Sequence, residues 1–251
     1  MFINYTKKKI YLAVPKTGTT SIQTYLIENL NNEENISHTQ VPYKGNILPR
    51  RNMPKGREGD NKLSDLDPHL TLQNGIDSGL FTKDELEDFS IYAIIRDPVD
   101  RFLSFAYHQM QMYYVNAKKV PEGSDVSFAQ MGKTNNDIAE EYLGIIKGEI
   151  VSEVQKWMSS DYVIQLHNVI GRPQSDWLIF NDKPIDKLFS LDNCEGLIND
   201  FLGEEHKLTY RYRSEYRNHE DKTQLDDSLL QEIKQMYYKD FELYNEFNRK
   251  P

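Results

Sequence analysis

A short stretch near the start of the chain combines residue types that bind anions. Residues 15–21 read Pro-Lys-Thr-Gly-Thr-Thr-Ser and follow the apolar run Ile10–Val14. A buried strand, a glycine-containing turn and a helix start form the arrangement in which backbone N–H groups converge on a negative group. An ammonium and several hydroxyls add side-chain donors. The stretch therefore predicts a phosphate-binding loop formed by Lys16, Thr17, Gly18, Thr19, Thr20 and Ser21.

The order of residues in this loop differs from that of the nucleotide-hydrolase loop. In the hydrolase loop the lysine follows the second glycine and precedes Ser or Thr. Here Lys16 precedes Gly18, which is the only glycine of the stretch. An ordinary tight turn between a strand and a helix is the alternative, although such a turn does not require this run of hydroxyl residues.

A second anion-binding motif lies in Tyr92–Gln109, which reads YAIIRDPVDRFLSFAYHQ. Arg96 ends the predicted strand, and strand ends of open α/β sheets face the ligand crevice. On the helix that follows, one face carries Arg101, Ser104 and His108, at spacings i, i+3 and i+7. Arg96 as a bidentate fork and Ser104 as a hydroxyl donor are thus predicted to hold one phosphate. For Arg101, an ion pair on the helix surface with Asp97 or Asp100 is the alternative.

Strands and helices alternate along the chain and would position these motifs. The predicted strands are 10–14, 90–95 and short segments within 177–180 and 187–191; the predicted helices are 21–30, 82–89, a helix capped by Asp97 with Pro98 first, 138–146, 152–166, 192–202 and 226–247. This order favours an α/β fold: a P-loop-like central parallel sheet flanked by helices, in a single domain over residues 1–251. The polar stretches 31–62 and 115–136 are expected to be loop insertions on the acceptor side.

Composition narrows the class of protein. A formal net charge of -9 over 251 residues disfavours binding to nucleic acid or to an anionic membrane. No apolar run approaches the roughly 20 residues that span a bilayer, and the N-terminus lacks the pattern of a signal peptide. The single cysteine, Cys194, is expected to pack in a helix and fits a reducing compartment. These features predict a cytoplasmic protein.

The two motifs together carry a resemblance to a known family. The chain resembles the sulfotransferase superfamily in two motifs, PKTGTTS after a first strand and RDPVDRFLSFAYH after a later one. It is most similar to the branch that sulfates carbohydrates, the heparan 2-O-sulfotransferase-like enzymes. Weaker similarity extends to DYVIQLHNVIG, DKLFSLDNCEGLINDFLG and YKDFELYNEF. The resemblance implies transfer of the sulfuryl group of 3′-phosphoadenosine 5′-phosphosulfate (PAPS) to an acceptor hydroxyl, with 3′,5′-ADP as the product.

The resemblance also implies roles for particular residues. Lys16–Ser21 would cradle the 5′-phosphosulfate, and Arg96 with Ser104 would hold the 3′-phosphate. Arg213 and Ser214 stand in the segment that closes over the donor in this family. Lys16 is expected to stabilise the leaving oxygen, without any metal.

The acceptor hydroxyl requires a general base. His69 stands between the two motifs, where the family places a catalytic histidine. His108, Asp84 and Glu85 are the alternatives. The other histidines are expected to be structural or exposed: His38, His167, His206 and His219.

A basic stretch of the sequence indicates the kind of acceptor. The stretch 41–62 is basic within an acidic chain, and it suggests an anionic sugar near Arg50, Arg51, Lys55 and Arg57, or else a solvated loop. A carbohydrate or a small metabolite is the predicted acceptor. A P-loop-type nucleotide kinase and a non-catalytic module that binds 3′,5′-ADP or a sulfated glycan are the alternative functions.

Overall fold

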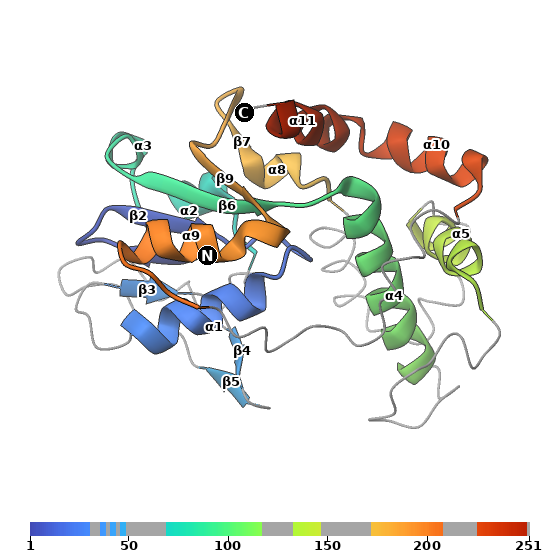
Figure 1. The fold of residues 1–251 in the computed structure, drawn as a ribbon, viewed down its shortest axis with the longest axis horizontal. Helices are drawn as coiled ribbons and strands as arrows, with labels where there is room; N and C mark the ends of the chain where they lie inside the picture. Colours follow the sequence, from blue (N-terminus) through green and yellow to red (C-terminus); the bar gives the residue numbers. More distant parts are fainter. Residues whose placement is uncertain are drawn as a thin grey trace. The chain divides into compact units, whose positions relative to one another are not determined.

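The structure is a computed structural model that divides into two compact units. Figure 1 shows its helices and strands. The structure describes residues 1–30, 36–38, 41–43, 46–48, 69–116, 133–146, 172–207 and 225–249. The first unit comprises Met1–Arg96 and Gln174–Arg213, and the second comprises Asp97–Pro173 and Ser214–Pro251. The predicted helix at 152–166 lies outside the described residues.

A mixed sheet forms the centre of the first unit. Its strands are β1 (Phe2–Asn4), β2 (Lys9–Leu12), β3 (Ile36–His38), β6 (Ser90–Ile95) and β9 (Lys187–Ser190). They lie in the order β3-β1-β2-β6-β9, with β2, β6 and β9 parallel and β1 antiparallel to both of its neighbours. The α/β fold is confirmed, and the predicted parallel sheet is found in these three strands.

The antiparallel edge of this sheet was not predicted. β1 and β2 form a hairpin that turns through Lys8, whose φ is 51°. The stretch 31–62, which was expected to be a loop, contains β3 and a separate hairpin of β4 (Val41–Tyr43) and β5 (Asn46–Leu48). Strands of three residues are too short to show an alternating hydrophobic pattern in the sequence. They are defined by the hydrogen bonding of their main chains to neighbouring strands.

Two helices cover one face of the sheet. α1 (Thr19–Leu30) and α9 (Cys194–Leu202) lie side by side (Figure 1). Alternate positions of β6, Tyr92 and Ile94, pack against them in one hydrophobic cluster. Cys194 is buried in this cluster, as predicted. The 3₁₀ turn η2 (Leu191–Asn193) precedes α9, and Gly203 caps the helix in the left-handed conformation, at φ 85°.

Short elements complete the first unit: α2 (Leu72–Asp77), α3 (Lys83–Leu86), α8 (Ser175–Leu178), β7 (Ile179–Phe180) and β8 (Lys183–Pro184). The capping box predicted at Thr82 is confirmed, because the Thr82 side chain and the Glu85 side chain each bond the other's backbone N–H. The predicted strand at 177–180 is only half correct. Its first two residues, Trp177 and Leu178, belong to α8, and their N–H groups donate to Gln174 O.

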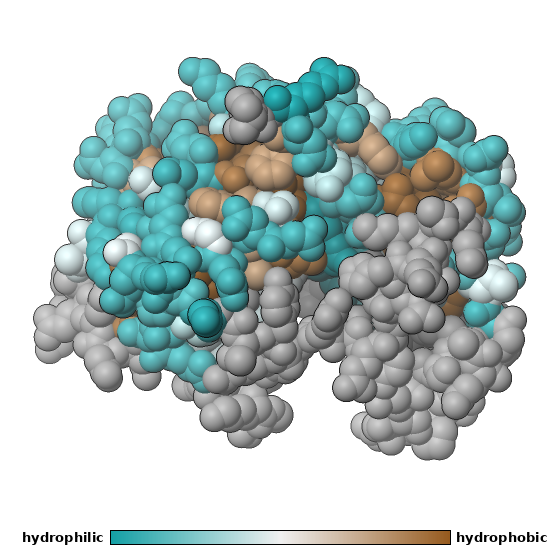
Figure 2. All heavy atoms as spheres, viewed as in Figure 1, coloured by the Kyte–Doolittle hydropathy of each residue, from teal (hydrophilic) through white to brown (hydrophobic). Residues whose placement is uncertain are grey.

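Helices form the described part of the second unit: α4 (Pro98–Asn116), α5 (Asn135–Ile146), α10 (Asp227–Met236) and α11 (Tyr238–Arg249). Asp97 caps α4 as predicted, since its Oδ1 accepts the N–H of Asp100 at 2.9 Å. The core contains Phe102, Tyr142 and Ile233, and hydrophobic residues are visible where α5 and α10 meet (Figure 2). None of the helices that the structure describes is long and apolar enough to cross a membrane.

Two boundaries in the second unit differ from the prediction. The insertion expected at 115–136 is shorter, because α4 continues to Asn116 and α5 begins at Asn135. The prediction of one unbroken last helix is wrong: α10 ends at Met236, and the backbone of the next residue, Tyr237, leaves helical geometry at φ -113° and ψ 30°. Tyr237 is nevertheless buried, so its side chain stays in the core at the break, as the predicted packing role requires.

Candidate active site

The loop between β2 and α1 has a backbone suited to an anion. Lys16 and Gly18 both have positive φ, 64° and 77°. Left-handed residues alternating with right-handed ones turn successive N–H groups toward one side of the chain. The N–H groups of Ser21 and Ile22 donate to Gly18 O, whereas those of residues 16–20 donate to no residue that the structure describes. The loop therefore presents a run of backbone donors at the start of α1.

The side chains of the loop divide into two groups. The Thr17 hydroxyl donates to Val14 O at 2.9 Å, so Thr17 holds the loop together and would reach a ligand through its N–H. Thr19 is buried in the first turn of α1, whereas Thr20 and Ser21 are only partly buried. A Cβ at Gly18 would lie 2.7 Å from Leu191 Cδ1, so the leucine side chain would have to shift, and φ 77° is strained for any residue with a Cβ.

Lys16 and Arg96 place two cationic groups at this loop. Arg96 Nη1 donates to Lys16 O at 2.7 Å. Burial, and then the charge of Arg96, lower the pKa of Lys16 to about 8. Two cations at one turn repel each other, and a bound anion would relieve that repulsion.

Gln174 fixes the backbone of Arg96. Arg96 N donates to Gln174 Oε1 at 3.1 Å, and Gln174 Nε2 donates to Arg96 O at 2.8 Å. Gln174 is fully buried. Sequence reasoning missed Gln174, since nothing in the local pattern marks a residue that bonds a strand end 78 positions away.

His69 is attached to the same loop. Its Nδ1 lies 2.6 Å from Ala13 O, and Trp177 Nε1 donates to His69 O at 2.8 Å. A carbonyl oxygen can only accept, so Nδ1 carries the hydrogen and Nε2 is the basic nitrogen of the neutral ring. The structure thus brings His69, Lys16 and Arg96 to residues 13–16 of the loop.

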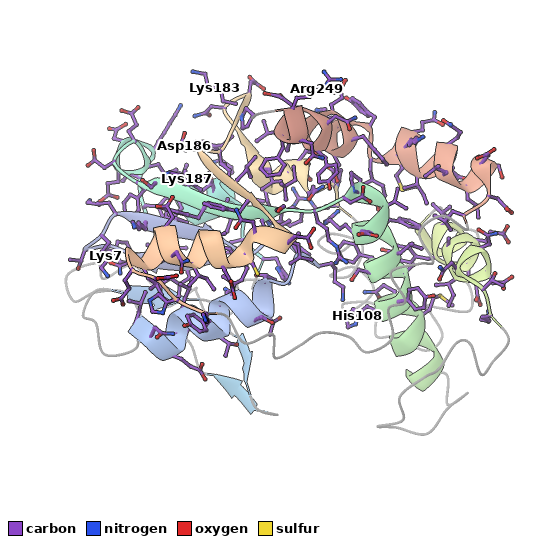
Figure 3. All side chains as sticks on the ribbon, viewed as in Figure 1. Lys7, His108, Lys183, Asp186, Lys187 and Arg249 are labelled. Carbon is purple, nitrogen blue, oxygen red and sulfur yellow. The ribbon has the colours of Figure 1, made fainter. Side chains whose placement is uncertain are left out.

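The other predicted residues stand elsewhere. Ser104 and His108 lie half-buried on α4 of the second unit, where His108 is labelled in Figure 3, and their roles stay predictions. Asp84 is exposed, and the Glu85 carboxylate accepts the Thr82 N–H at 2.8 Å in the capping box. Outside the described residues lie Arg50, Arg51, Lys55, Arg57, Arg213 and Ser214.

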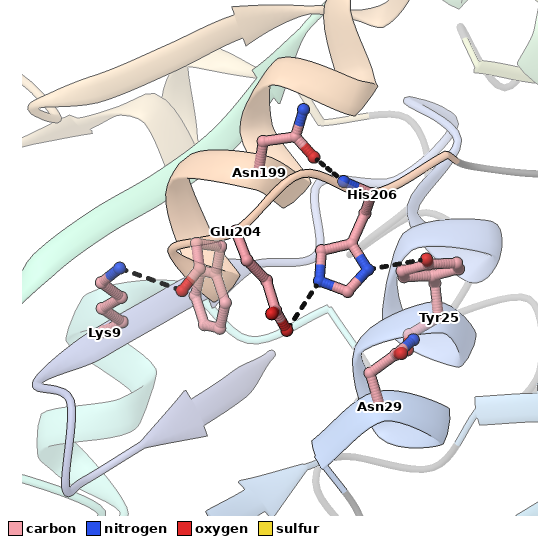
Figure 4. Close-up of polar contacts among 7 residues, drawn as sticks. Lys9, Tyr25, Asn29, Asn199, Glu204 and His206 are labelled. Atoms are coloured by element: carbon pink, nitrogen blue, oxygen red, sulfur yellow. Dashed lines mark hydrogen bonds and ion pairs between the residues drawn. The ribbon is translucent and has the colours of Figure 1, made fainter.

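His206 occupies a structural position, as expected from the sequence. Its Nδ1 lies 3.0 Å from Tyr25 Oη and its Nε2 lies 3.2 Å from a Glu204 carboxylate oxygen (Figure 4). Its backbone N–H donates to Asn199 Oδ1 at 2.7 Å. These contacts join α1 to the segment that follows α9.

Comparison with known proteins identifies the class of this site. A family model described as "Sulfotransferase family" matches residues 1–248, which include the β2–α1 loop, His69 and Arg96. No curated protein and no solved structure matches the chain significantly. Because the family match extends over almost the whole sequence, the chain belongs to the sulfotransferase family.

Proposed function

We propose that this protein transfers the sulfuryl group of PAPS to an acceptor hydroxyl of a carbohydrate or a small metabolite. Membership of the sulfotransferase family supports sulfuryl transfer. The observation that supports the proposal most is the meeting of three groups at one loop: Lys16 belongs to it, Arg96 Nη1 donates to Lys16 O, and His69 Nδ1 bonds Ala13 O. The same loop thus carries two cations that could bind an anion and an imidazole that could act as a base.

The loop fits the charged end of this donor. A phosphosulfate carries several negative oxygens, and the backbone N–H groups of residues 16–20 have no acceptor among the described residues. The start of α1 favours the same charge. Lys16, Thr20 and Ser21 would add side-chain donors. By the family resemblance, Arg96 and Ser104 are proposed to hold the 3′-phosphate, and Arg213 and Ser214 to belong to the segment that closes over the donor.

Lys16 and His69 would then have different roles in the transfer reaction. When bound, the donor supplies an activated sulfuryl group attached to a phosphate leaving group. The Lys16 ammonium would stabilise the negative charge that develops on the leaving oxygen. His69 Nε2 would accept the proton of the acceptor hydroxyl as its oxygen bonds to sulfur. Both groups act by in-line positioning and charge stabilisation.

The acceptor and the location of the reaction are also proposals. The basic residues Arg50, Arg51, Lys55 and Arg57 would suit an anionic sugar, as in the heparan 2-O-sulfotransferase-like branch. The only cysteine, Cys194, is buried, which fits a reducing compartment such as the cytoplasm.

Calorimetry tests the donor. We expect 3′,5′-ADP to bind equally well with and without Mg²⁺, and more tightly than ATP. Tight binding of ATP that requires Mg²⁺ would instead identify a nucleotide kinase.

Transfer of radiolabelled sulfate from PAPS to a panel of hydroxyl acceptors tests catalysis. For His69→Ala we expect kcat to fall by about 10²–10⁴-fold, with the affinity for 3′,5′-ADP retained. The same loss in His108→Ala, with His69→Ala active, would move the base to His108. Binding of 3′,5′-ADP without any transfer would leave a binding module.

A further inference from the structure

We infer that Gln174 and Trp177 form a brace that positions both halves of the active site. Gln174 holds Arg96, and Trp177 holds His69. Neither residue would touch the substrates, so both are positioning residues. This inference rests on the proposed function for the roles of Arg96 and His69, but the contacts of the brace do not depend on it.

Gln174 controls the main chain of Arg96 at the end of β6. Both backbone polar groups of Arg96 are bonded by the one side-chain amide, at 3.1 and 2.8 Å. Both residues are buried, so water is a poor substitute for the amide. The orientation of the Arg96 guanidinium toward Lys16 O starts from this backbone.

Trp177 controls the main chain of His69. The Trp177 side chain is 1% exposed, and its indole N–H is bonded to His69 O. The His69 ring is bonded from its other side, through Nδ1, to Ala13 O. His69 is therefore held at its backbone carbonyl and at its ring, and loss of the Trp177 bond would let the His69 backbone shift and weaken the ring contact that orients Nε2.

The two brace side chains are fixed relative to each other. The N–H groups of Trp177 and Leu178 donate to Gln174 O at 3.0 and 3.1 Å, which closes the turn of α8. Ile185 N donates to Leu178 O at 2.9 Å and ties this turn to the residue that follows β8. A displacement of α8 would thus move Arg96 and His69 together, and misplacement by about 1 Å can reduce turnover about 100-fold.

The Trp177 half is tested by removing the indole N–H. Trp177→Phe does so with a smaller ring, and replacement of Trp177 by benzothienylalanine does so at nearly constant volume. We expect both variants to bind 3′,5′-ADP within about twofold of wild type, but to lose about tenfold in kcat. Long-range ¹H–¹⁵N spectra, with His69→Gln to assign the ring signals, should show the Nδ1–H tautomer in wild type and mixed tautomers in the variants.

The Gln174 half is tested with Gln174→Met and Gln174→Glu. We expect the Kd for 3′,5′-ADP to rise about tenfold, because the Arg96 backbone loses one or both of its bonds to the side chain of residue 174. The His69 tautomer should stay as in wild type. Gln174→Glu keeps the acceptor for Arg96 N and serves as the second variant if Gln174→Met does not fold.

Tyr92→Phe is the matched control. It removes one hydrogen bond of a buried aromatic residue, to Asp200 at 3.1 Å, in the same unit. This variant should leave kcat, the Kd for 3′,5′-ADP and the His69 tautomer unchanged.

Two results would overturn the brace. One is an unchanged His69 tautomer with unchanged kcat when the indole N–H is removed. The other is an equal change of every readout in the Gln174 and Trp177 variants together with a fall in Tm, which indicates general loosening. If wild type fails to bind 3′,5′-ADP, the proposed function fails, whereas the tautomer comparison still decides whether Trp177 positions His69.

Discussion

At the scale of single residues, Lys16 combines two unusual properties. Its backbone is in the left-handed region, and its ammonium has a lowered pKa because it is buried beside Arg96. The backbone supplies a turn that exposes N–H groups, and the side chain supplies a charge at the same point. A lysine outside such a turn would give the charge without the backbone donors.

The pKa of Lys16 predicts a pH dependence. The group is cationic below its pKa of about 8 and neutral above it, so the free enzyme loses the charge that attracts the donor as the pH rises. We expect kcat/KM for PAPS to fall as the pH rises above about 8. In Lys16→Arg, whose guanidinium stays charged, the fall should vanish. A fall that persists in Lys16→Arg would assign it to another group.

Gly18 predicts a second effect at the residue scale. Gly18→Ala should destabilise the fold by at least about 1–2 kcal/mol, because alanine is strained at φ 77° and its Cβ would also meet Leu191. It should also weaken binding of 3′,5′-ADP in calorimetry. Gly203→Ala is the control, because alanine there has the same strain at φ 85°, but its Cβ would have no atom of the described residues within 4 Å.

Partial recovery of binding in Gly18→Ala combined with Leu191→Ala would show that the clash matters in addition to φ. Equal loss of binding in Gly18→Ala and Gly203→Ala would contradict the prediction.

At the scale of elements, the starts of helices are set by side chains that bond the first N–H groups. Thr71 and Asn74 form one capping box before α2, and Thr82 and Glu85 form another before α3. α3 is only four residues long, so its cap is a large part of what holds it.

Removal of the Thr82 cap of α3 is expected to reduce stability without reducing activity. Thr82→Ala should lower the free energy of unfolding by about 0.5–2 kcal/mol in urea. Thr82→Ser keeps the hydroxyl and should cost much less. Transfer activity should be unchanged in both variants. Reduced activity in Thr82→Ala at temperatures where it is folded would show that Glu85 or Asp84 also serves catalysis.

At the scale of the whole molecule, each compact unit has a hydrophobic core of its own. The first is built on the sheet with α1 and α9, and the second on α4, α5, α10 and α11. In the second unit a buried ion pair joins Arg101 of α4 to Asp240 of α11 at 3.7 Å. Arg101 also donates to Arg172 O and stacks on Phe105. The surface ion pair considered for Arg101 is thus replaced by a buried one.

This pair predicts a large effect on stability. Asp240→Ala should lower the free energy of unfolding by about 3–5 kcal/mol, because a buried guanidinium loses its counter-charge. The double variant Arg101→Met with Asp240→Leu should recover most of that loss, since no buried charge remains. Urea unfolding followed by far-UV circular dichroism measures both. A double variant as unstable as Asp240→Ala would show that the pair is needed for packing and not for charge balance.

The sequence by itself was enough to predict what depends on neighbouring residues. β6 has the predicted bounds, and the caps at Thr82 and Asp97 are where the spacing placed them. α9 ends at Leu202 before Gly203 as expected, although it begins at Cys194 and not at 192. These features follow from periodicity and from bonds within four residues. The loop at Lys16 and the family resemblance were also readable, because both lie in short contiguous motifs.

Only the tertiary structure decided which distant groups meet. His69 bonds Ala13 across 56 positions, Gln174 bonds Arg96 across 78, and Trp177 bonds His69 across 108. The pairing of β1 with β3 and of Arg101 with Asp240 is of the same kind. No local pattern encodes such contacts, because they are selected by the packing of the sheet and helices that carry them. The anion-binding loop could be predicted from the sequence, whereas the distant residues that contact it are determined by the tertiary structure.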